Sequence, residues 1–374
     1  MRFEKTKTNK LFTANADGTA RSDPRVVRET VYVTEKNISF AIAPMIDWTD
    51  RHCRYFHRVM TKRALLYTEM IVADAVIHGD RERLLGDATA GPVALQLGGS
   101  DPDKLAEAAR IGTGFGYREI NLNVGCPSDR VQSGTFGACL MREPALVGQL
   151  VEAMKRAVDV PVTVKCRLGV DDQDTGPALD DLARAAWNGG ADGLWVHARK
   201  AWLEGLSPRE NREIPPLDYA RVGRLKAENP NRFIGLNGGL QNLDHALEAL
   251  NQCGAVLDGA MLGRAAYQSP ALLREADGMF FAERRPPLSF DEIIGEMAEY
   301  ADRHIAAGGR LHHVTRHMIG LFQGVPGARQ WRQTLSGEAV RPDAAADILR
   351  KAYLHLRDHA APAAASGLLA VRTG

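Results

Sequence analysis

The sequence contains no apolar run of about 18 residues that could cross a membrane. Its N-terminal stretch, MRFEKTKTNK, lacks the apolar core of a signal peptide. The five cysteines are odd in number and form no CxxC pair, so they indicate neither a disulfide framework nor a zinc site. We therefore expect a cytoplasmic protein with reduced thiols and no membrane partner.

The sequence also lacks an excess of charge, because 47 Lys and Arg residues against 46 Asp and Glu residues leave a net charge of +1. A nucleic-acid site would have to come from a local cluster of Lys and Arg. Glycine is abundant instead, with 36 residues, and the hydrophobic content of 45% is ample for a large core. These numbers favour one large domain with many tight turns and a smaller module beside it.

Short β-prone runs recur along the chain, at residues 38–44, 65–70, 93–98, 119–125, 162–167, 193–197, 233–237 and 259–263. Apolar residues at helical spacing lie between most of these runs. Eight strands alternating with helices predict an α/β fold of the (β/α)8 TIM barrel type. The alternative, a doubly wound open sheet, would need a glycine-rich fingerprint after the first strand, where Pro44-Met45-Ile46 stands instead.

Composition changes after residue 283, where Arg284-Arg285-Pro286-Pro287 predicts a linker. Ser289 and Glu292 then form a capping-box pattern that begins a helix. Further helices are expected over 311–322, 327–335 and 343–358. The predicted organisation is a disordered N-terminal tail (1–35), a TIM barrel catalytic domain (36–283), a small all-helical C-terminal domain (288–358) and a flexible tail (359–374).

Polar residues stand at the predicted C-terminal ends of most strands, which is where function lies in such a barrel. They are Glu69, Gln96, Asn123, Lys165, Arg167, His197, Arg199, Asn237 and Arg264. Single residues have ordinary explanations: Gln96 as a satisfied buried amide, Lys165 as a partner of Glu69, and His197 as a packed histidine. A polar residue at so many strand ends is difficult to assign to stability alone.

Glycine-rich turns follow the seventh and eighth predicted strands, at Asn237-Gly238-Gly239 and Gly263-Arg264. Free N–H groups in such turns form the usual phosphate site of this fold, with Arg264 as counter-charge. Together with Gln96, Lys165 and His197 across the barrel mouth, they suit a flat phosphorylated cofactor with the shape of FMN. Lys165 would then stabilise the negative charge of the reduced flavin.

Cys126 follows the fourth predicted strand in the run Asn123-Val124-Gly125-Cys126-Pro127. A buried packing role is the ordinary fate of a lone cysteine. The role of a nucleophile would need a base partner, and none adjoins Cys126 in the sequence. Because free thiols are mostly protonated at neutral pH, Cys126 is suited to donate a proton to carbon while a flavin delivers hydride to the neighbouring carbon.

These motifs together resemble the tRNA-dihydrouridine synthase family. The resemblance rests on APMIDWTD at 43–50, NLNVGCPS at 121–128, Val164-Lys165, HAR at 197–199 and NGG at 237–239. The runs HARKAWL at 197–203, SPRENREIPPLDY at 207–219, RHMIGLFQG at 316–324 and PGARQWR at 326–332 resemble its DusA subfamily. The similarity extends from about 38 to 336, outside the two predicted tails.

The resemblance implies an FMN oxidoreductase that uses NADPH as reductant and Cys126 as general acid. It implies cofactor contacts from Pro44, Met45, Ile46, Gln96, Lys165, His197, Asn237, Gly238, Gly239, Gly263 and Arg264. For the subfamily it implies tRNA contacts from Asn123, Arg209, Arg212, Arg329 and Arg332. The implied reaction is reduction of uridines 20 and 20a in the D-loop of tRNA, with hydride to C6 and the proton to C5.

Two other functions remain open at this point: an FMN-dependent reductase of a free pyrimidine, similar to dihydroorotate dehydrogenase, and a non-catalytic RNA-binding barrel protein. Arg329, Trp331 and Arg332 argue against a small substrate, which needs no such surface. No obligate protein partner is indicated. We expect no metal site, because the pair His313 and His317 has basic neighbours and no third ligand after it in the sequence.

Overall fold

The computed structural model describes residues 38–86, 91–128 and 136–365, with side chains as far as 358. The predicted N-terminal tail and the end of the predicted C-terminal tail lie outside the described residues. The described residues all belong to one compact unit. No helix in the described part of the chain is long and apolar enough to cross a membrane.

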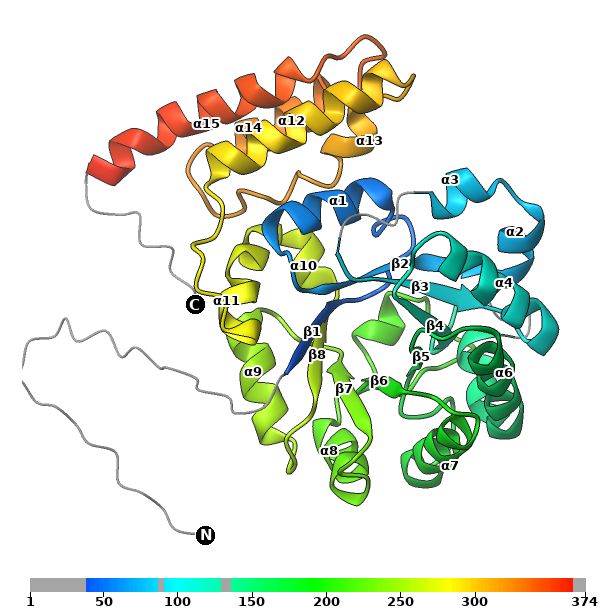
Figure 1. Cartoon of the computed structure of the whole chain (residues 1–374). Helices are drawn as coiled ribbons and strands as arrows, with labels where there is room; N and C mark the ends of the chain where they lie inside the picture. Colours follow the sequence, from blue (N-terminus) through cyan, green and yellow to red (C-terminus); the bar gives the residue numbers. More distant parts are fainter. Residues whose placement is uncertain (1–37, 87–90, 129–135, 366–374) are drawn as a thin grey trace, which may run out of the picture. The chain divides into compact units, whose positions relative to one another are not determined.

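A closed barrel of parallel strands forms the centre of this unit, which confirms the predicted TIM barrel (Figure 1). The strands follow one another around the barrel in chain order, so each pairs with its neighbours in sequence and the last pairs with the first. They are β1 (Ser39–Ile42), β2 (Leu65–Val72), β3 (Val93–Gly98), β4 (Glu119–Val124), β5 (Val162–Cys166), β6 (Gly193–His197), β7 (Phe233–Asn237) and β8 (Gly259–Leu262).

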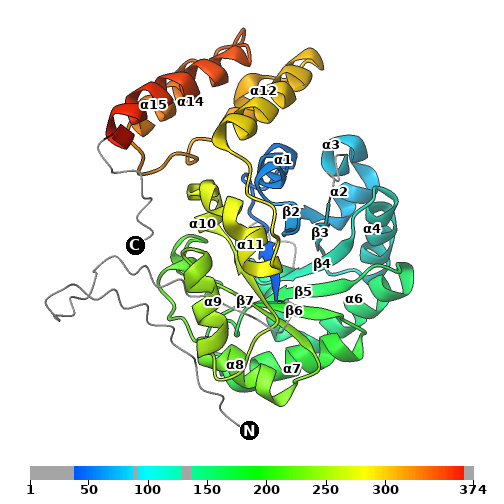
Figure 2. The ribbon, with the colours of Figure 1, turned by 60° about the vertical axis from the view of Figure 1, so that its left-hand side comes forward.

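Helices surround the strands, as Figures 1 and 2 show. The α-helices between strands, together with α10 after β8, are α1 (Arg51–Met60), α2 (Ala73–His78), α3 (Arg81–Leu85), α4 (Pro102–Gly114), α6 (Pro144–Ala157), α7 (Thr175–Asn188), α8 (Tyr219–Glu228), α9 (Leu243–Gln252) and α10 (Arg264–Gln268). Three short 3-10 helices accompany them: η1 (Gly137–Arg142), η2 (Glu210–Arg212) and η3 (Pro270–Glu275).

The interior of the barrel is filled by side chains, as expected for this fold. Trp195 on β6 is 1% exposed and occupies space that Gly235 on β7 leaves open, because a Cβ atom at Gly235 would lie 2.2 Å from the Trp195 ring. Near the N-terminal ends of the strands, Tyr67 and Thr163 donate hydrogen bonds to the carboxylate of Glu119. Burial raises the pKa of Glu119 to about 7. The barrel is therefore a closed core with an opening at one end.

The C-terminal elements are α11 (Ala276–Phe281), α12 (Phe290–Ala306), α13 (Leu311–Thr315), α14 (Ala328–Gly337) and α15 (Asp347–Ala365). Ser289 and Glu292 form the expected capping box of α12. The predicted helix over 311–322 ends at Thr315, and turns follow. Gly320 in these turns packs so closely that a Cβ atom would lie 2.2 Å from the Gln268 carbonyl oxygen. The last helix continues to Ala365, beyond the predicted end at 358.

Trp331 on α14 is part of the core of these helices. Its side chain is fully buried, and its Nε1–H donates to the Met318 carbonyl at 3.0 Å. The Phe322 ring lies edge-on to it, with ring centroids 4.9 Å apart. The prediction that Trp331 belongs to a surface for RNA is therefore wrong. Its ring is buried and packs among the C-terminal helices.

Helix α12 packs against α1 of the barrel. The Tyr55 and Tyr300 rings stack with centroids 3.9 Å apart, and the Tyr300 hydroxyl lies 2.8 Å from His52 Nδ1. Asp50, the N-cap of α1, pairs with Arg316 at 2.5 Å and with His317 at 3.0 Å. Aromatic stacking, a hydrogen bond and ion pairs thus connect the barrel to the helices that follow it.

Candidate active site

A cavity of about 830 Å³ opens at the C-terminal ends of the barrel strands. It brings together all the residues predicted to contact the cofactor, together with the predicted acid and part of the predicted tRNA set. The predicted residues that line it are Pro44, Met45, Ile46, Gln96, Asn123, Cys126, Lys165, His197, Arg212, Asn237, Gly238, Gly239, Gly263 and Arg264. Arg209, Arg329 and Arg332 do not line it.

The turn that carries Cys126 is held by the side chain of Asn123. Its Oδ1 atom accepts hydrogen bonds from the backbone N–H groups of Gly125, at 3.1 Å, and Cys126, at 3.0 Å. Its Nδ2 donates to Gln96 Oε1 at 2.8 Å. The Asn123 amide therefore positions the cysteine, and its contact with tRNA remains a prediction.

The same hydrogen-bond chain continues into the barrel. Gln96 Nε2 donates to Asn121 Oδ1 at 2.8 Å, and Asn121 Nδ2 donates to Thr163 Oγ1 at 2.8 Å. Gln96 is 1% exposed and both ends of its amide are hydrogen-bonded, as expected for a satisfied buried amide. Because every amide in the chain has partners on both ends, the chain fixes side-chain orientations from the barrel interior to the cysteine turn.

Arg167 supports the cysteine turn from the other side. Its Nε donates to the Gly125 carbonyl at 3.0 Å, and its Nη1 donates to the Lys200 and Asn211 carbonyls at 3.0 and 2.8 Å. Burial lowers the pKa of its guanidinium to about 10. Sequence analysis placed Arg167 at a strand end but gave it no role. Its position two residues after Lys165 was the only feature of the sequence that pointed to the site. The role itself could not be predicted, because the three carbonyls that Arg167 binds are remote from it in sequence.

Lys165 lies in the cavity wall without a carboxylate partner among the described residues. Its Nζ donates to Asn237 Oδ1 at 3.0 Å. The suggested partner Glu69 instead accepts a hydrogen bond from the Asp47 backbone N–H, so the pairing of Lys165 with Glu69 is wrong. Burial, assisted by the charge of Arg167, lowers the pKa of Lys165 to about 8. An anionic ligand beside Lys165 would stabilise its charged form.

His197 presents an unused nitrogen at the cavity. Burial and the nearby charges of Arg167 and Lys165 hold the pKa of His197 well below its ordinary value, so the ring is neutral. Its Nδ1 atom is buried and has no hydrogen-bond partner among the described residues. Gly238, with a φ of +105°, lies against the ring, where a Cβ atom would come within 3.1 Å of Cε1. A ligand that reaches this nitrogen would satisfy it.

A cationic corner follows β6, β7 and β8. Arg264 pairs with Glu213 at 2.7 Å, so part of its charge is already neutralised. Arg199, which sequence analysis placed at a strand end without assigning a contact, also lines the cavity, and its Nε is buried without a partner among the described residues. The Gly238 and Gly239 turn has left-handed φ angles of +105° and +72° that favour glycine.

The residues of the cavity therefore suit a ligand that carries an anionic group and hydrogen-bonding atoms. The fit rests on the unpartnered His197 Nδ1 and Arg199 Nε atoms and on the buried Lys165 cation, all within one cavity. A buried cation and buried donors without partners cost free energy, which an anion with hydrogen-bond acceptors would offset.

The remaining predicted tRNA residues lie on the protein surface. Arg329 and Arg332 are exposed on α14. The Arg209 side chain is 81% exposed, 3.6 Å from Glu213. The predicted tRNA set is thus divided between the cavity rim, where Arg212 lies, and α14.

Replacing Asn123 by Ala should loosen the cysteine turn. The change removes the acceptor of two backbone N–H groups and a partner of Gln96, so we expect the free energy of unfolding to fall by about 2–3 kcal/mol. Urea denaturation measures this loss, and alkylation of the Cys126 peptide, followed by mass spectrometry, should become faster.

Ser128→Ala is the matched control. Ser128 contacts only the Cys126 sulfur among the described side chains, at 3.5 Å, so its removal should change the free energy of unfolding by less than about 0.5 kcal/mol. Equal stability of the two variants would contradict the role given to Asn123.

The chain is similar in sequence to proteins of one described family. A family model described as dihydrouridine synthase (Dus) matches residues 41–356. The tRNA-dihydrouridine(20/20a) synthase of Vibrio vulnificus is 53% identical over 313 residues, covering 83% of this chain and 95% of that protein. The synthases of the same name from Yersinia pestis and Salmonella typhi are each 50% identical, covering 84% and 85% of this chain and 90% and 95% of those proteins.

Among solved structures, the old yellow enzyme homologue from Zymomonas mobilis is similar at 13% identity and a TM-score of 0.46, over 69% of this chain and 92% of that one. A likeness at this level carries no inference about activity. The family match and the identity to relatives over most of the chain lead to one conclusion: the chain belongs to the dihydrouridine synthase family.

Proposed function

We propose that this protein reduces uridine to 5,6-dihydrouridine at positions 20 and 20a in the D-loop of tRNA, with FMN as its bound cofactor and NADPH as reductant. One observation carries the proposal: Cys126 lies in the same cavity as Lys165 and the unpartnered His197 nitrogen. The relatives named for this reaction support the choice of substrate, since they match this chain over nearly their whole length.

Cys126 is the proposed general acid. Its sulfur contacts Ser128 Oγ at 3.5 Å, and no imidazole or carboxylate of the described residues lies within hydrogen-bond distance of it. A thiol held beside the reacting carbon is a group that can serve as general acid. FMN bound in the cavity would supply, when reduced, the hydride for C6 of the uracil, and Cys126 would give the proton to C5, so the base would gain two hydrogens in all.

The cavity residues hold the cofactor in this proposal. Lys165 and His197 would face the polar edge of the flavin, where a positive charge and a hydrogen bond stabilise the reduced form. The Asn237-Gly238-Gly239 turn, Gly263 and Arg264 would take the phosphate, with Arg199 as an additional cation. Pro44, Met45, Ile46 and Gln96 would complete the wall.

The tRNA would be held by arginines at the cavity rim and on the surface beyond it. Arg209 and Arg212 lie at η2, and Arg329 and Arg332 lie on α14. Arginine forks suit phosphate, and the target base would be splayed from its stack into the cavity. A net charge of +1 agrees with a restricted basic surface. All five cysteines are free thiols, which supports the cytoplasm as the place of this reaction.

Incubation with NADPH and tRNA that lacks dihydrouridine tests this function. Nuclease fragments of the product should show a gain of two hydrogens in the D-loop fragment that contains positions 20 and 20a, by mass spectrometry. Yellow protein that bleaches with NADPH but leaves every tRNA fragment unchanged would exclude tRNA as substrate. A free pyrimidine assayed in parallel then tests the alternative reductase.

The paired substitution Arg329→Ala and Arg332→Ala should weaken tRNA binding. Loss of charged contacts to phosphate predicts a loss of affinity on the order of 10-fold or more. The slope of log Kd against log salt concentration should fall by about 1–2. Both quantities can be measured by filter binding across a salt series.

Arg224→Ala on α8 is the control, since this exposed arginine lies outside the proposed tRNA set. An equal loss of affinity in the control and in the paired variant would show that binding depends on total charge rather than on α14.

A further inference from the structure

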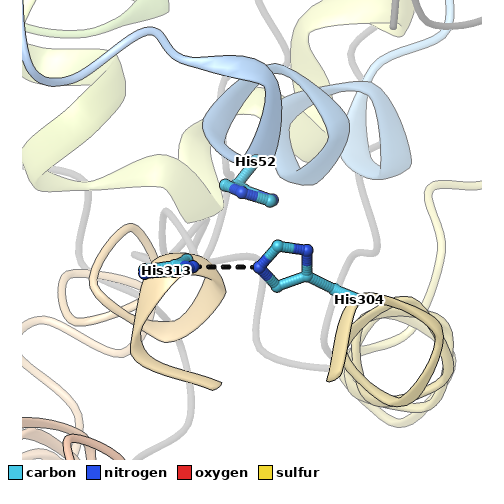
Figure 3. Close-up of side chains that lie close together, drawn as sticks. All are labelled: His52, His304 and His313. Atoms are coloured by element: carbon cyan, nitrogen blue, oxygen red, sulfur yellow. Dashed lines mark hydrogen bonds between the residues drawn. The ribbon is translucent and has the colours of Figure 1, made fainter. Parts of the chain in front are cut away.

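Three histidines from three helices meet beside the joint between α1 and α12. They are His52 on α1, His304 on α12 and His313 on α13, and each offers a ring nitrogen within 4.8 Å of the other two (Figure 3). His304 Nε2 and His313 Nδ1 lie 3.0 Å apart, and the His52 and His304 ring centroids lie 4.4 Å apart. His52 is buried, while the other two are half-buried.

This cluster differs from the pair considered in the sequence. His317 is engaged elsewhere: it lies 3.0 Å from Asp50 and 3.1 Å from the Tyr267 hydroxyl. His313 instead meets His304 and His52, which are remote from one another in sequence. Sequence analysis found no third ligand near His313 because its neighbours in this cluster come from other helices.

The chemistry of the three rings suits a metal ion. Each ring offers one nitrogen to the same small space, and a neutral imidazole binds a cation through such a nitrogen without losing a net proton. The Tyr300 hydroxyl lies 2.8 Å from His52 Nδ1, which leaves Nε2 as the free ligand atom. Such a partner on the second nitrogen orients metal-binding histidines.

Nearby arginines oppose a cation, but hydrogen bonds hold their guanidinium groups. Arg51 donates to the Glu82 and Arg83 carbonyls at 2.8 and 2.6 Å, and Arg310 donates to the Val340 carbonyl at 2.7 Å. Arg316 pairs with Asp50 at 2.5 Å. The Asp50 carboxylate acts on all three histidines in the direction that favours positive charge.

We propose that His52, His304 and His313 bind one divalent transition-metal ion of the zinc class and thereby fasten α1 of the barrel to α12 and α13. Imidazole nitrogen suits Zn²⁺, Co²⁺, Ni²⁺ and Cu²⁺. Zn–N distances of about 2.0–2.1 Å in a tetrahedral site place ligand atoms about 3.3 Å apart. The 3.0 Å pair is close to that spacing, and the other ligand atoms lie within 4.8 Å of one another. Water would take the fourth position.

Binding changes the hydrogen bond between two of the rings. The 3.0 Å contact joins a donor nitrogen of one neutral ring to an acceptor nitrogen of the other. With metal bound, both nitrogens become ligands, so His304 carries its proton on Nδ1 and His313 carries its proton on Nε2. Only the ring that donated the hydrogen bond changes tautomer, because the acceptor ring already carries its proton on the far nitrogen. The charge of each ring is unchanged by this change of tautomer.

Cobalt titration of protein stripped with EDTA tests the site. The full chain should bind one Co²⁺ with visible absorption typical of tetrahedral coordination, and Zn²⁺ should displace it and raise the melting temperature. His304→Gln and His313→Gln should each weaken binding by at least about 100-fold. Loss of a residue that only supports a ligand can already weaken metal binding by about that much, and these variants lose a ligand itself. His355→Gln, an exposed histidine on α15, should bind as the unmodified chain does.

A second variant leaves all three histidines in place. A Cβ atom at Gly309 would lie 2.1 Å from His304 Nε2, so Gly309→Ala should displace that ring and weaken binding as well. Circular dichroism checks that each variant is folded. Absence of saturable binding to the unmodified chain, or binding by the folded His304→Gln and His313→Gln variants as tight as that of the unmodified chain, would overturn the proposal. These readouts do not depend on uridine reduction.

Discussion

The Asn123 carboxamide determines where the one half-buried thiol of the cavity lies. Two backbone N–H groups, those of Gly125 and Cys126, converge on its oxygen, while its nitrogen donates into the chain of amides that begins at Gln96. Arg167 holds the Gly125 carbonyl from the opposite side. Because the turn is bound from both directions, the cysteine is placed by the barrel rather than by its own loop, and proton donation to a bound base depends on that placement.

The electrostatics of the cavity complement this geometry. Lys165 is buried beside an amide instead of a carboxylate, and His197 is neutral with an unpartnered nitrogen. Such groups are costly in an empty protein and are stabilised by an anionic ligand. These groups favour a ligand that carries negative charge and hydrogen-bond acceptors.

The sequence predicts the barrel well because the alternation of strands and helices is a local property. It also predicts which residues line the cavity, because polar residues follow the strands in chain order. It cannot predict contacts between remote segments. Lys165 meets Asn237 rather than Glu69, and Arg167 binds the carbonyls of Gly125, Lys200 and Asn211. The burial of Trp331 likewise arises only when the C-terminal helices pack together, and the three histidines meet only when α12 and α13 pack against α1.

The most direct test of Cys126 as the proton donor separates the two halves of the reaction. In Cys126→Ala, stopped-flow absorbance should show flavin reduction by NADPH at the unmodified rate, and reoxidation by tRNA slowed by about 100-fold or more. Cys139→Ala, a half-buried thiol outside the cavity wall, should be unaffected in both halves. Reoxidation of Cys126→Ala by tRNA at the unmodified rate, with dihydrouridine formed, would contradict the account.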